Sequence, residues 1–272
     1  MSALVGWLWV LLAAFVVVAL AMAATAVLAR RTRRASVVDI TWGLACLGVA
    51  IVATVVARAQ GLGSSWVQWL LVGCTTVWAV RLSGHIGWRS IGHGEDPRYD
   101  RLLGGLPIDG AGFRVAVRKV FVTQGLAVLL ITLPLQVGSV AQVRWPVVAW
   151  VGVLAFAVGL FFEAVGDVQL ERYKALPRDS RPAVLDTGLW AWTRHPNYFG
   201  DATVWWGLWL IGGLACGWWA ALASVIAPVA MTHFLRNVTG AALLEREMMK
   251  RPAFVEYAAR TAYFVPRPPR RG

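Results

Sequence analysis

The residues best suited to chemistry gather in one short segment, Asp186–Asp201, directly ahead of an apolar run. Within it lie hydrogen-bond donors, acceptors and aromatic rings, namely Arg194, His195, Asn197, Tyr198 and Asp201. Pro196 restricts any helix to the residues that follow it, so these side chains should converge where a helix begins. A structural loop is one interpretation, but so dense a polar set favours a binding site for a polar group.

A second polar group follows the fifth apolar run of the chain. Glu163, Asp167 and Glu171 are spaced four apart and therefore share one helix face, and Arg172 and Lys174 lie close by. The stripe could be a solvated helix end. Because it begins while its neighbours are still apolar, we favour a polar wall of a cofactor cavity.

Ionisable residues inside apolar runs are costly and invite a functional explanation. Asp39 opens the second run, where it could also simply interact with the helix dipole. Arg81 and His85 lie one helical turn apart in the third run and share a face. Arg81 could extend toward the lipid head groups, whereas His85 is a candidate proton donor. We take Asp39 and His85 as candidate catalytic residues.

The C-terminal tail, 239–272, forms a third polar cluster. Thr239–Lys250 fits an amphipathic helix, and Pro252 starts a second helix that carries Tyr257 and Arg260. Both could lie on the membrane surface or complete the site. The Pro- and Arg-rich composition of Pro266–Gly272 predicts a disordered end that touches anionic lipid head groups.

Motifs of soluble nucleotide and metal enzymes are absent. The sequence has no Gly-x-Gly-x-x-Gly after a strand, no phosphate loop, no zinc-ligand spacing and no nucleophile elbow. Its three cysteines lie in apolar stretches and form no disulfide framework. A nucleotide cofactor would therefore lie among membrane helices and their loops, with Arg and Lys holding its phosphates. We expect no metal.

Composition identifies the elements that must position these residues. The chain is 58% hydrophobic and only 15% charged, so lipid must cover part of its apolar surface. A bilayer core needs about 20 apolar residues per helix. We therefore expect an all-α, multi-pass protein, a single membrane domain over 1–272, with about seven spans at 4–29, 37–57, 66–86, 115–137, 146–166, 199–213 and 215–235.

Charge fixes the expected orientation. Of the 26 Lys and Arg residues, 23 lie in the loops and tail of one membrane side, and only Arg58 and Arg144 lie in the opposite loops. The positive-inside rule then predicts an outer N-terminus, a cytoplasmic C-terminus and residence in the inner (plasma) membrane. The net charge of +12 sits in clusters between apolar runs, so a nucleic-acid partner is not expected.

Several segments, taken in order, match one group of proteins. They are Val38-Asp39-x-x-Trp42-Gly43, Arg89-x-x-Gly92-x-Gly94-Glu95-Asp96-x-Arg98-Tyr99, Gly166-Asp167-x-Gln169-Leu170-x-x-Tyr173-Lys174, Thr193–Asp201, and Leu244-Glu245 with Arg251-Pro252 and Tyr257. Over roughly residues 37–266 the chain resembles bacterial membrane proteins of the steroid 5-alpha-reductase-like superfamily, which includes NADPH-dependent reductases of conjugated C=C bonds.

The resemblance implies a seven-helix fold and NADPH held between the later spans and the inner loops. Matched by position, it implies cofactor contacts at Asp167, Lys174, Asn197, Tyr198, Asp201, Tyr257 and Arg260. We add Arg172, Arg194 and His195, which lie in the same polar segments. The implied partners are membrane lipids and a lipid-like substrate (steroid, isoprenoid or acyl) entering from the bilayer.

In the steroid reductases a glutamate in the second span and a tyrosine in the third polarise the enone carbonyl. The nearest counterparts are Asp39 and His85, and neither span contains a tyrosine. We expect hydride transfer to an electron-poor alkene carbon, with Asp39 and His85 orienting or protonating the activating group. The missing tyrosine argues against a steroid substrate.

Two other functions remain open. Membrane methyltransferases that use S-adenosylmethionine share an Arg-His-Pro-x-Tyr segment and a late Glu, although they usually carry a paired Glu-Glu where this chain has Glu245-Arg246-Glu247. A non-catalytic lipid-binding protein could retain the same fold.

The orientation is testable with a reporter fused after the last residue. We expect a fused green fluorescent protein to fluoresce and a fused alkaline phosphatase to be inactive, because the tail is cytoplasmic. An active phosphatase at that position would contradict both the map of spans and the proposed site.

Overall fold

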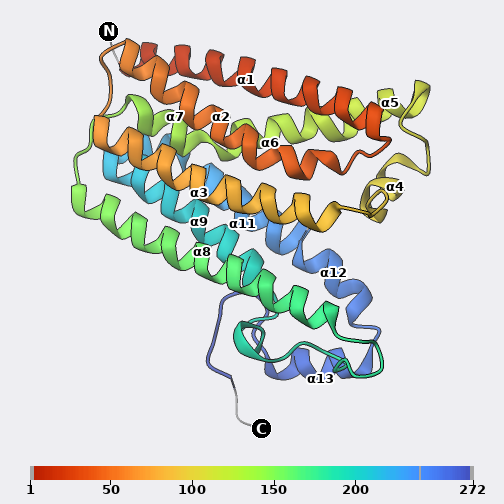
Figure 1. The fold of residues 1–272 in the computed structure, drawn as a ribbon. Coiled ribbons are helices and arrows are strands. Elements are labelled where there is room, and N and C mark those ends of the chain that lie inside the picture. Colours follow the sequence, from red (N-terminus) through yellow and green to blue (C-terminus); the bar gives the residue numbers. More distant parts are fainter. Residues whose placement is uncertain (1–2, 239, 270–272) are drawn as a thin grey trace. The chain divides into compact units, whose positions relative to one another are not determined.

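The computed structural model describes residues 3–238 and 240–269, and every regular element in that part of the chain is helical (Figure 1). The all-α prediction is thus confirmed for these residues. The longer helices are α1 (Ala3–Thr32), α2 (Val37–Ala59), α3 (Ser65–Ser90), α8 (Pro146–Ala175) and α9 (Pro196–Gly212). The shorter ones are α4 (Pro97–Leu103), α5 (Gly110–Ala116), α6 (Thr123–Ile131), α7 (Leu133–Val140), α10 (Trp218–Ser224), α11 (Ile226–His233), α12 (Ala241–Met248) and α13 (Pro252–Arg260).

Several helices are long and apolar enough to cross a membrane. Four qualify in the described chain, and a fifth qualifies if the bent pair Gly110–Ile131 and Leu133–Val140 counts as one span; the four are Ala3–Thr32, Val37–Ala59, Pro146–Ala175 and Trp218–Met248. Exposed apolar side chains such as Leu20 and Leu154, both 65% exposed, suit a lipid environment. The expected spans 66–86 and 199–213 coincide with α3 and α9, which are not among the five. The count of seven stays a prediction.

Contacts within the predicted membrane domain concentrate in two compact units. Unit 1 holds the described residues up to Ala149 together with Ile211–Val225. Unit 2 holds Trp150–Leu210 together with the described residues from Ile226 onward.

In unit 1, α2 packs between α1 and α3 (Figure 1). Small residues of α2, among them Ala53 and Ala57, are fully buried in a cluster with Val10 of α1. Farther along the helix, Trp78 of α3 is completely buried and meets Trp42 of α2 edge to face, with ring centroids 5.9 Å apart. Small side chains thus let α1 and α2 approach closely, and the two tryptophans fill the space between α2 and α3.

The bend between α6 and α7 has a chemical cause. Pro134 lacks the backbone N–H that would continue the helix, and the two segments meet at 42°. The buried Gln136 side chain donates to the Leu129 carbonyl at 3.0 Å, and the Thr132 hydroxyl donates to the Val128 carbonyl at 2.7 Å. The Gln136 side chain thus gives the Leu129 carbonyl a partner beside the break, as an apolar environment requires. The Thr132 hydroxyl adds a second donor to the Val128 carbonyl, which already accepts the Thr132 N–H at 3.0 Å.

In unit 2, glycines allow α8 and α9 to approach closely. A Cβ atom on Gly159 would lie 2.5 Å from the Val204 nitrogen, and one on Gly200 would lie 2.3 Å from the Glu163 nitrogen. A Cβ atom on Gly207 would likewise lie 2.6 Å from the Phe156 nitrogen. Such small residues are typical of membrane helix pairs whose backbones touch. This approach brings the polar end of α8 to the start of α9.

The tail differs from its sequence-based description in one respect. The expected amphipathic helices are present as α12 and α13, although Thr239, the expected first residue, lies outside the described residues. The predicted disorder from Pro266 is wrong at Arg267, because its backbone N–H donates to the Trp192 carbonyl at 3.0 Å. Composition missed this because backbone pairing does not depend on side-chain type. Residues 270–272 also lie outside the described part.

Enlarging one glycine of the α8–α9 contact should destabilise the protein. Gly200→Val places a side chain against backbone, and overpacking of this kind costs about 1–3 kcal/mol, or roughly 2–4 °C in Tm per kcal/mol. Gly73→Val on α3 is the control, because a Cβ there meets nothing within 4 Å. Thermal unfolding in detergent measures both, and equal Tm values for the two variants would refute the close contact.

Candidate functional site

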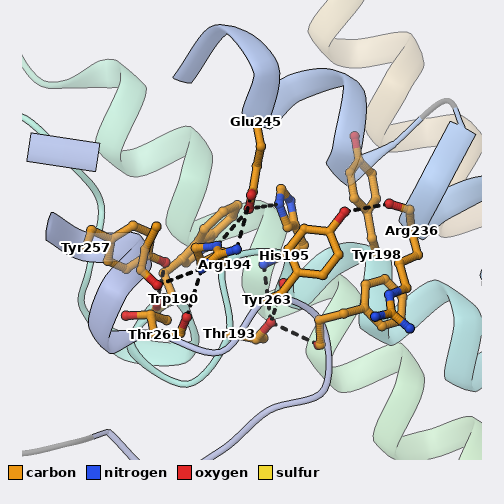
Figure 2. Close-up of polar contacts among 12 residues, drawn as sticks. Trp190, Thr193, Arg194, His195, Tyr198, Arg236, Glu245, Tyr257, Thr261 and Tyr263 are labelled. Carbon is orange, nitrogen blue, oxygen red and sulfur yellow. Dashed lines mark hydrogen bonds and ion pairs between the residues drawn. The ribbon is translucent and has the colours of Figure 1, made fainter. Parts of the chain in front are cut away.

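Arg194 lies at the centre of a hydrogen-bond network that joins the loop ahead of α9 to the tail (Figure 2). Its Nε and Nη2 donate to the two carboxylate oxygens of Glu245, at 2.7 and 3.1 Å. Its Nη1 donates to the backbone carbonyls of Ala258 and Thr261, at 2.8 and 3.1 Å. A guanidinium binds a carboxylate most strongly in this two-bond geometry. Arg194 therefore fixes α12 and the end of α13 to the loop.

His195 shares the same carboxylate. The His195 Nε2 lies 2.9 Å from a Glu245 oxygen, and His195 as a whole is only 3% exposed. Its ring stacks on Tyr198, with centroids 5.7 Å apart and planes 12° from parallel, and meets Tyr263 edge to face. The side chains of Arg194 and Glu245 are only 10% and 9% exposed, so water screens this ion pair weakly.

The tail also holds the backbone of the loop. The Tyr257 hydroxyl donates to the Trp190 carbonyl at 2.6 Å (Figure 2). The Thr193 hydroxyl and the Arg194 N–H each donate to a tail carbonyl at 2.9 Å. Burial is the main cause that raises the pKa of Tyr257, so its hydroxyl keeps its proton and remains a donor. The loop thus owes its shape to residues about seventy positions away.

Asn197 and Asp167 meet where α9 begins beside α8. The Asn197 Nδ2 donates to Asp167 Oδ1 at 3.0 Å, and its Oδ1 accepts the Tyr198 N–H at 3.1 Å. The contact is possible because Gly166 lets Pro196 and Asn197 approach α8. Asp201 follows one turn later on α9 and is partly buried. Two predicted cofactor residues, thirty positions apart, are therefore brought together.

The remaining predicted cofactor residues of unit 2 lie nearer its surface. Arg260 Nη2 donates to Asp186 at 2.5 Å, and Lys174 pairs with Glu171 at 3.3 Å. Arg172 is exposed at the end of α8. A hollow of about 160 Å³ lies next to Arg260 and is lined by Ala191, Ala259, Arg260, Thr261, Ala262, Arg267 and Pro268. Its two charged lining residues are both basic, which suits an anionic group.

In unit 1, the carboxylate of Asp39 binds two side chains of α4. Tyr99 donates its hydroxyl to Asp39 Oδ1 at 2.6 Å, and Arg98 Nη2 donates to Oδ2 at 3.0 Å. Arg98 also pairs with Asp96 at 2.9 Å. His85 lies half-buried on α3 of the same unit, and its role as the partner of Asp39 stays a prediction.

Tyr99 is a functional candidate that the sequence pattern did not single out. It belongs to α4 and is 6% exposed. Burial, followed by the adjacent Asp39 carboxylate, raises the pKa of Tyr99, so the phenol is protonated at neutral pH. Burial acts against the charge of Asp96, but hydrogen bonds from Arg98 outweigh it and lower the pKa of Asp96. The signal was available, because Arg98-Tyr99 closes one of the family-like motifs.

Comparisons with known proteins add one match. A family model described as protein of unknown function (DUF1295) matches residues 25–261. No curated protein and no solved structure matches the chain significantly. Within the described residues, no group of three or more His, Cys, Asp or Glu side chains is arranged to hold a metal ion.

Removing the charge of Glu245 should destabilise unit 2 strongly. Glu245→Gln leaves Arg194 buried without its counter-ion, and breaking a buried pair in this way costs about 3–5 kcal/mol. Glu247→Gln is the control, because Glu247 pairs with Lys250 while 72% exposed, and exposed pairs contribute about 0–1 kcal/mol. Thermal unfolding of the purified variants measures the difference. A Glu245→Gln protein as stable as the control would show that the network does not hold the tail.

Proposed function

This chain belongs to the family described as DUF1295, proteins of unknown function, and from the contacts above we propose that it is a membrane-embedded, NADPH-dependent reductase of a conjugated C=C bond in a lipid-like substrate. The proposal includes seven spans in the inner (plasma) membrane, with the N-terminus outside and the C-terminus cytoplasmic. It groups the chain with the steroid 5-alpha-reductase-like proteins that its motifs resemble.

The contact between Tyr99 and Asp39 is the observation that carries the proposal. Reduction of a conjugated alkene builds negative charge on the activating carbonyl oxygen, and a preplaced donor stabilises that charge. The sequence offered Asp39 but no tyrosine in the neighbouring spans. The structure supplies a phenol from α4, 2.6 Å from the carboxylate. An acid and a phenol are thus available together, as the proposed chemistry needs.

Each residue can be given a role in the reaction. NADPH, when bound, supplies a hydride to the alkene carbon remote from the carbonyl. The Tyr99 hydroxyl has one proton, which it directs at Asp39 in the structure; in the reaction this proton turns to the carbonyl oxygen as charge develops there, while Arg98 stays bound to Asp39. A proton from Tyr99 or His85 then bonds to the carbon next to the carbonyl and completes the saturated bond, and the donor regains its proton from water. Arg98 balances the charge of Asp39 through their 3.0 Å contact. His85 is the second candidate donor.

The polar residues of unit 2 suit a dinucleotide. Asn197 and Asp167 offer an amide and a carboxylate side by side, which can exchange hydrogen bonds with a cofactor amide or hydroxyl. Arg172, Lys174 and Arg260 are cations at the surface and suit phosphates. Arg194 already makes four hydrogen bonds within the protein. We therefore propose that Arg194 and His195 order the loop that presents Asn197 and Tyr198.

A second candidate function has one observation in its favour. Arg194 and His195 both bind Glu245 in the tail, so the Arg-His-Pro-x-Tyr segment and the late Glu are in contact. Membrane methyltransferases that use S-adenosylmethionine share these two features. Methyl transfer has no use for the carboxylate of Asp39 and the phenol of Tyr99, which lie in contact in unit 1. We therefore rank the reductase first.

Cofactor binding separates these functions. Titration of detergent-purified protein with NADPH should quench the fluorescence of its 16 tryptophans, whereas S-adenosylmethionine should not. Asn197→Ala and Asp167→Ala should each weaken NADPH binding about tenfold, since a lost hydrogen bond costs about 0.5–1.5 kcal/mol or more when charged.

Asp179→Ala, an exposed aspartate of the same unit, is the control and should bind NADPH like the wild type. Binding of S-adenosylmethionine in place of NADPH would favour the methyltransferase. Binding of neither would favour a non-catalytic lipid-binding protein. Unchanged NADPH affinity in both site variants would remove Asn197 and Asp167 from the cofactor site.

A further inference from the structure

Glu95 binds the start of α2 from a distant part of the chain. Its carboxylate accepts the backbone N–H groups of Ala35 and Ser36, the latter at 3.0 Å, and also the N–H of Asp96 at 2.9 Å. Ala35 and Ser36 lie about sixty positions earlier in the sequence. One carboxylate therefore satisfies backbone donors on both sides of this contact.

The contact replaces a missing helix cap. Ser36 is the residue ahead of α2, but its side chain makes no capping hydrogen bond. The first N–H groups of a helix lack partners within the helix and carry partial positive charge, so a carboxylate is favourable there. Glu95 takes this place at the N-cap residue Ser36, and it ties the loop after α3 to the two residues that lead into α2.

The same turn of α2 carries Asp39, and the same loop carries Tyr99. Between Glu95 and Tyr99, the Asp96 side chain accepts the Arg98 N–H at 2.8 Å and caps α4 at its first turn. Because α4 is capped and short, fixing Glu95 at one end fixes the direction in which Tyr99 points. The Tyr99 hydroxyl then meets Asp39 at 2.6 Å.

Glycines set this segment apart from the helices on either side. Gly92, Gly104 and Gly105 have φ angles of 75°, 67° and 71°, and a Cβ atom on any of them would meet nothing within 4 Å. Their backbone conformation, not packing, therefore requires glycine. The chain turns sharply before and after α4, so the position of α4 depends on what it contacts.

We propose that Glu95 is a positioning residue that, by binding the backbone of Ala35 and Ser36 at the start of α2, docks α4 there and thereby holds the phenol of Tyr99 on Asp39. A role of Glu95 in catalysis rests on the proposed reductase function. The placement of Tyr99 by Glu95 does not depend on that function. Glu95 acts through Tyr99, whereas Asp39 and Tyr99 would touch the substrate. Arg98, bound to both Asp39 and Asp96, balances the acidic groups around the phenol.

Tyrosine NMR tests the placement directly. The chain has five tyrosines, so labelling their ζ carbons with ¹³C gives few signals, and Tyr99→Phe identifies the signal of Tyr99. In the wild type this phenol should ionise at higher pH than an exposed tyrosine, because burial and Asp39 raise its pKa. In Glu95→Ala it should ionise at lower pH, and its neutral-pH signal should move toward that of an exposed tyrosine. The signal of Tyr257 in unit 2 should not change.

Asp109→Ala is the matched control, because it removes an exposed carboxylate of unit 1 that pairs with Arg33, and it should leave the Tyr99 signal unchanged. If Glu95→Ala does not fold, Glu95→Gln replaces it, since one amide oxygen cannot accept all the bonds of the carboxylate; an intermediate shift is then expected. A Tyr99 signal and titration identical to wild type in the folded variant overturns the proposal. NADPH titration of the wild type is a separate arm, and its failure would reject the reductase but not the docking.

Discussion

A polar or charged group among apolar helices costs several kcal/mol unless it is hydrogen-bonded or paired, and this constraint organises the polar residues of this chain. Glu245 is buried because Arg194 and His195 bind it. Asp39 is accommodated in α2, a candidate membrane span, because Tyr99 and Arg98 reach it. The partners come from the loop ahead of α9 in the first case and from the short helix α4 in the second. These segments are therefore ordered by the same residues that are suited to chemistry.

Each unit uses a distant segment to complete its polar site. In unit 2 the tail supplies Glu245, Tyr257 and several backbone acceptors to the loop ahead of α9. In unit 1 the segment after α3 supplies Glu95 and Tyr99 to the start of α2. A preorganised site needs such support, because donors that must reorganise during reaction lose much of their effect. This support of each polar site by a distant segment is the basis on which we propose an enzyme.

The sequence predicted what depends on local pattern. The apolar run 37–57 became α2, Val37–Ala59, because helical hydropathy has a short range. The convergence of Arg194, His195 and Tyr198 was expected from their spacing around Pro196. Pairing between residues about sixty positions apart has no such periodic signal, so Tyr99 as the partner of Asp39 was missed. The docking of Arg267 was missed for a related reason, since a backbone hydrogen bond leaves no mark on composition.

We propose above all that NADPH binds beside the loop that the polar network of unit 2 orders. Hydrogen–deuterium exchange of the detergent-purified protein, with and without NADPH, tests it most directly. The account predicts slower exchange in the segments around Asp167 and Trp190–Tyr198 and in the tail around Tyr257, with little change in α1. Unchanged exchange in those segments with NADPH, or slowing there only with S-adenosylmethionine, would contradict it.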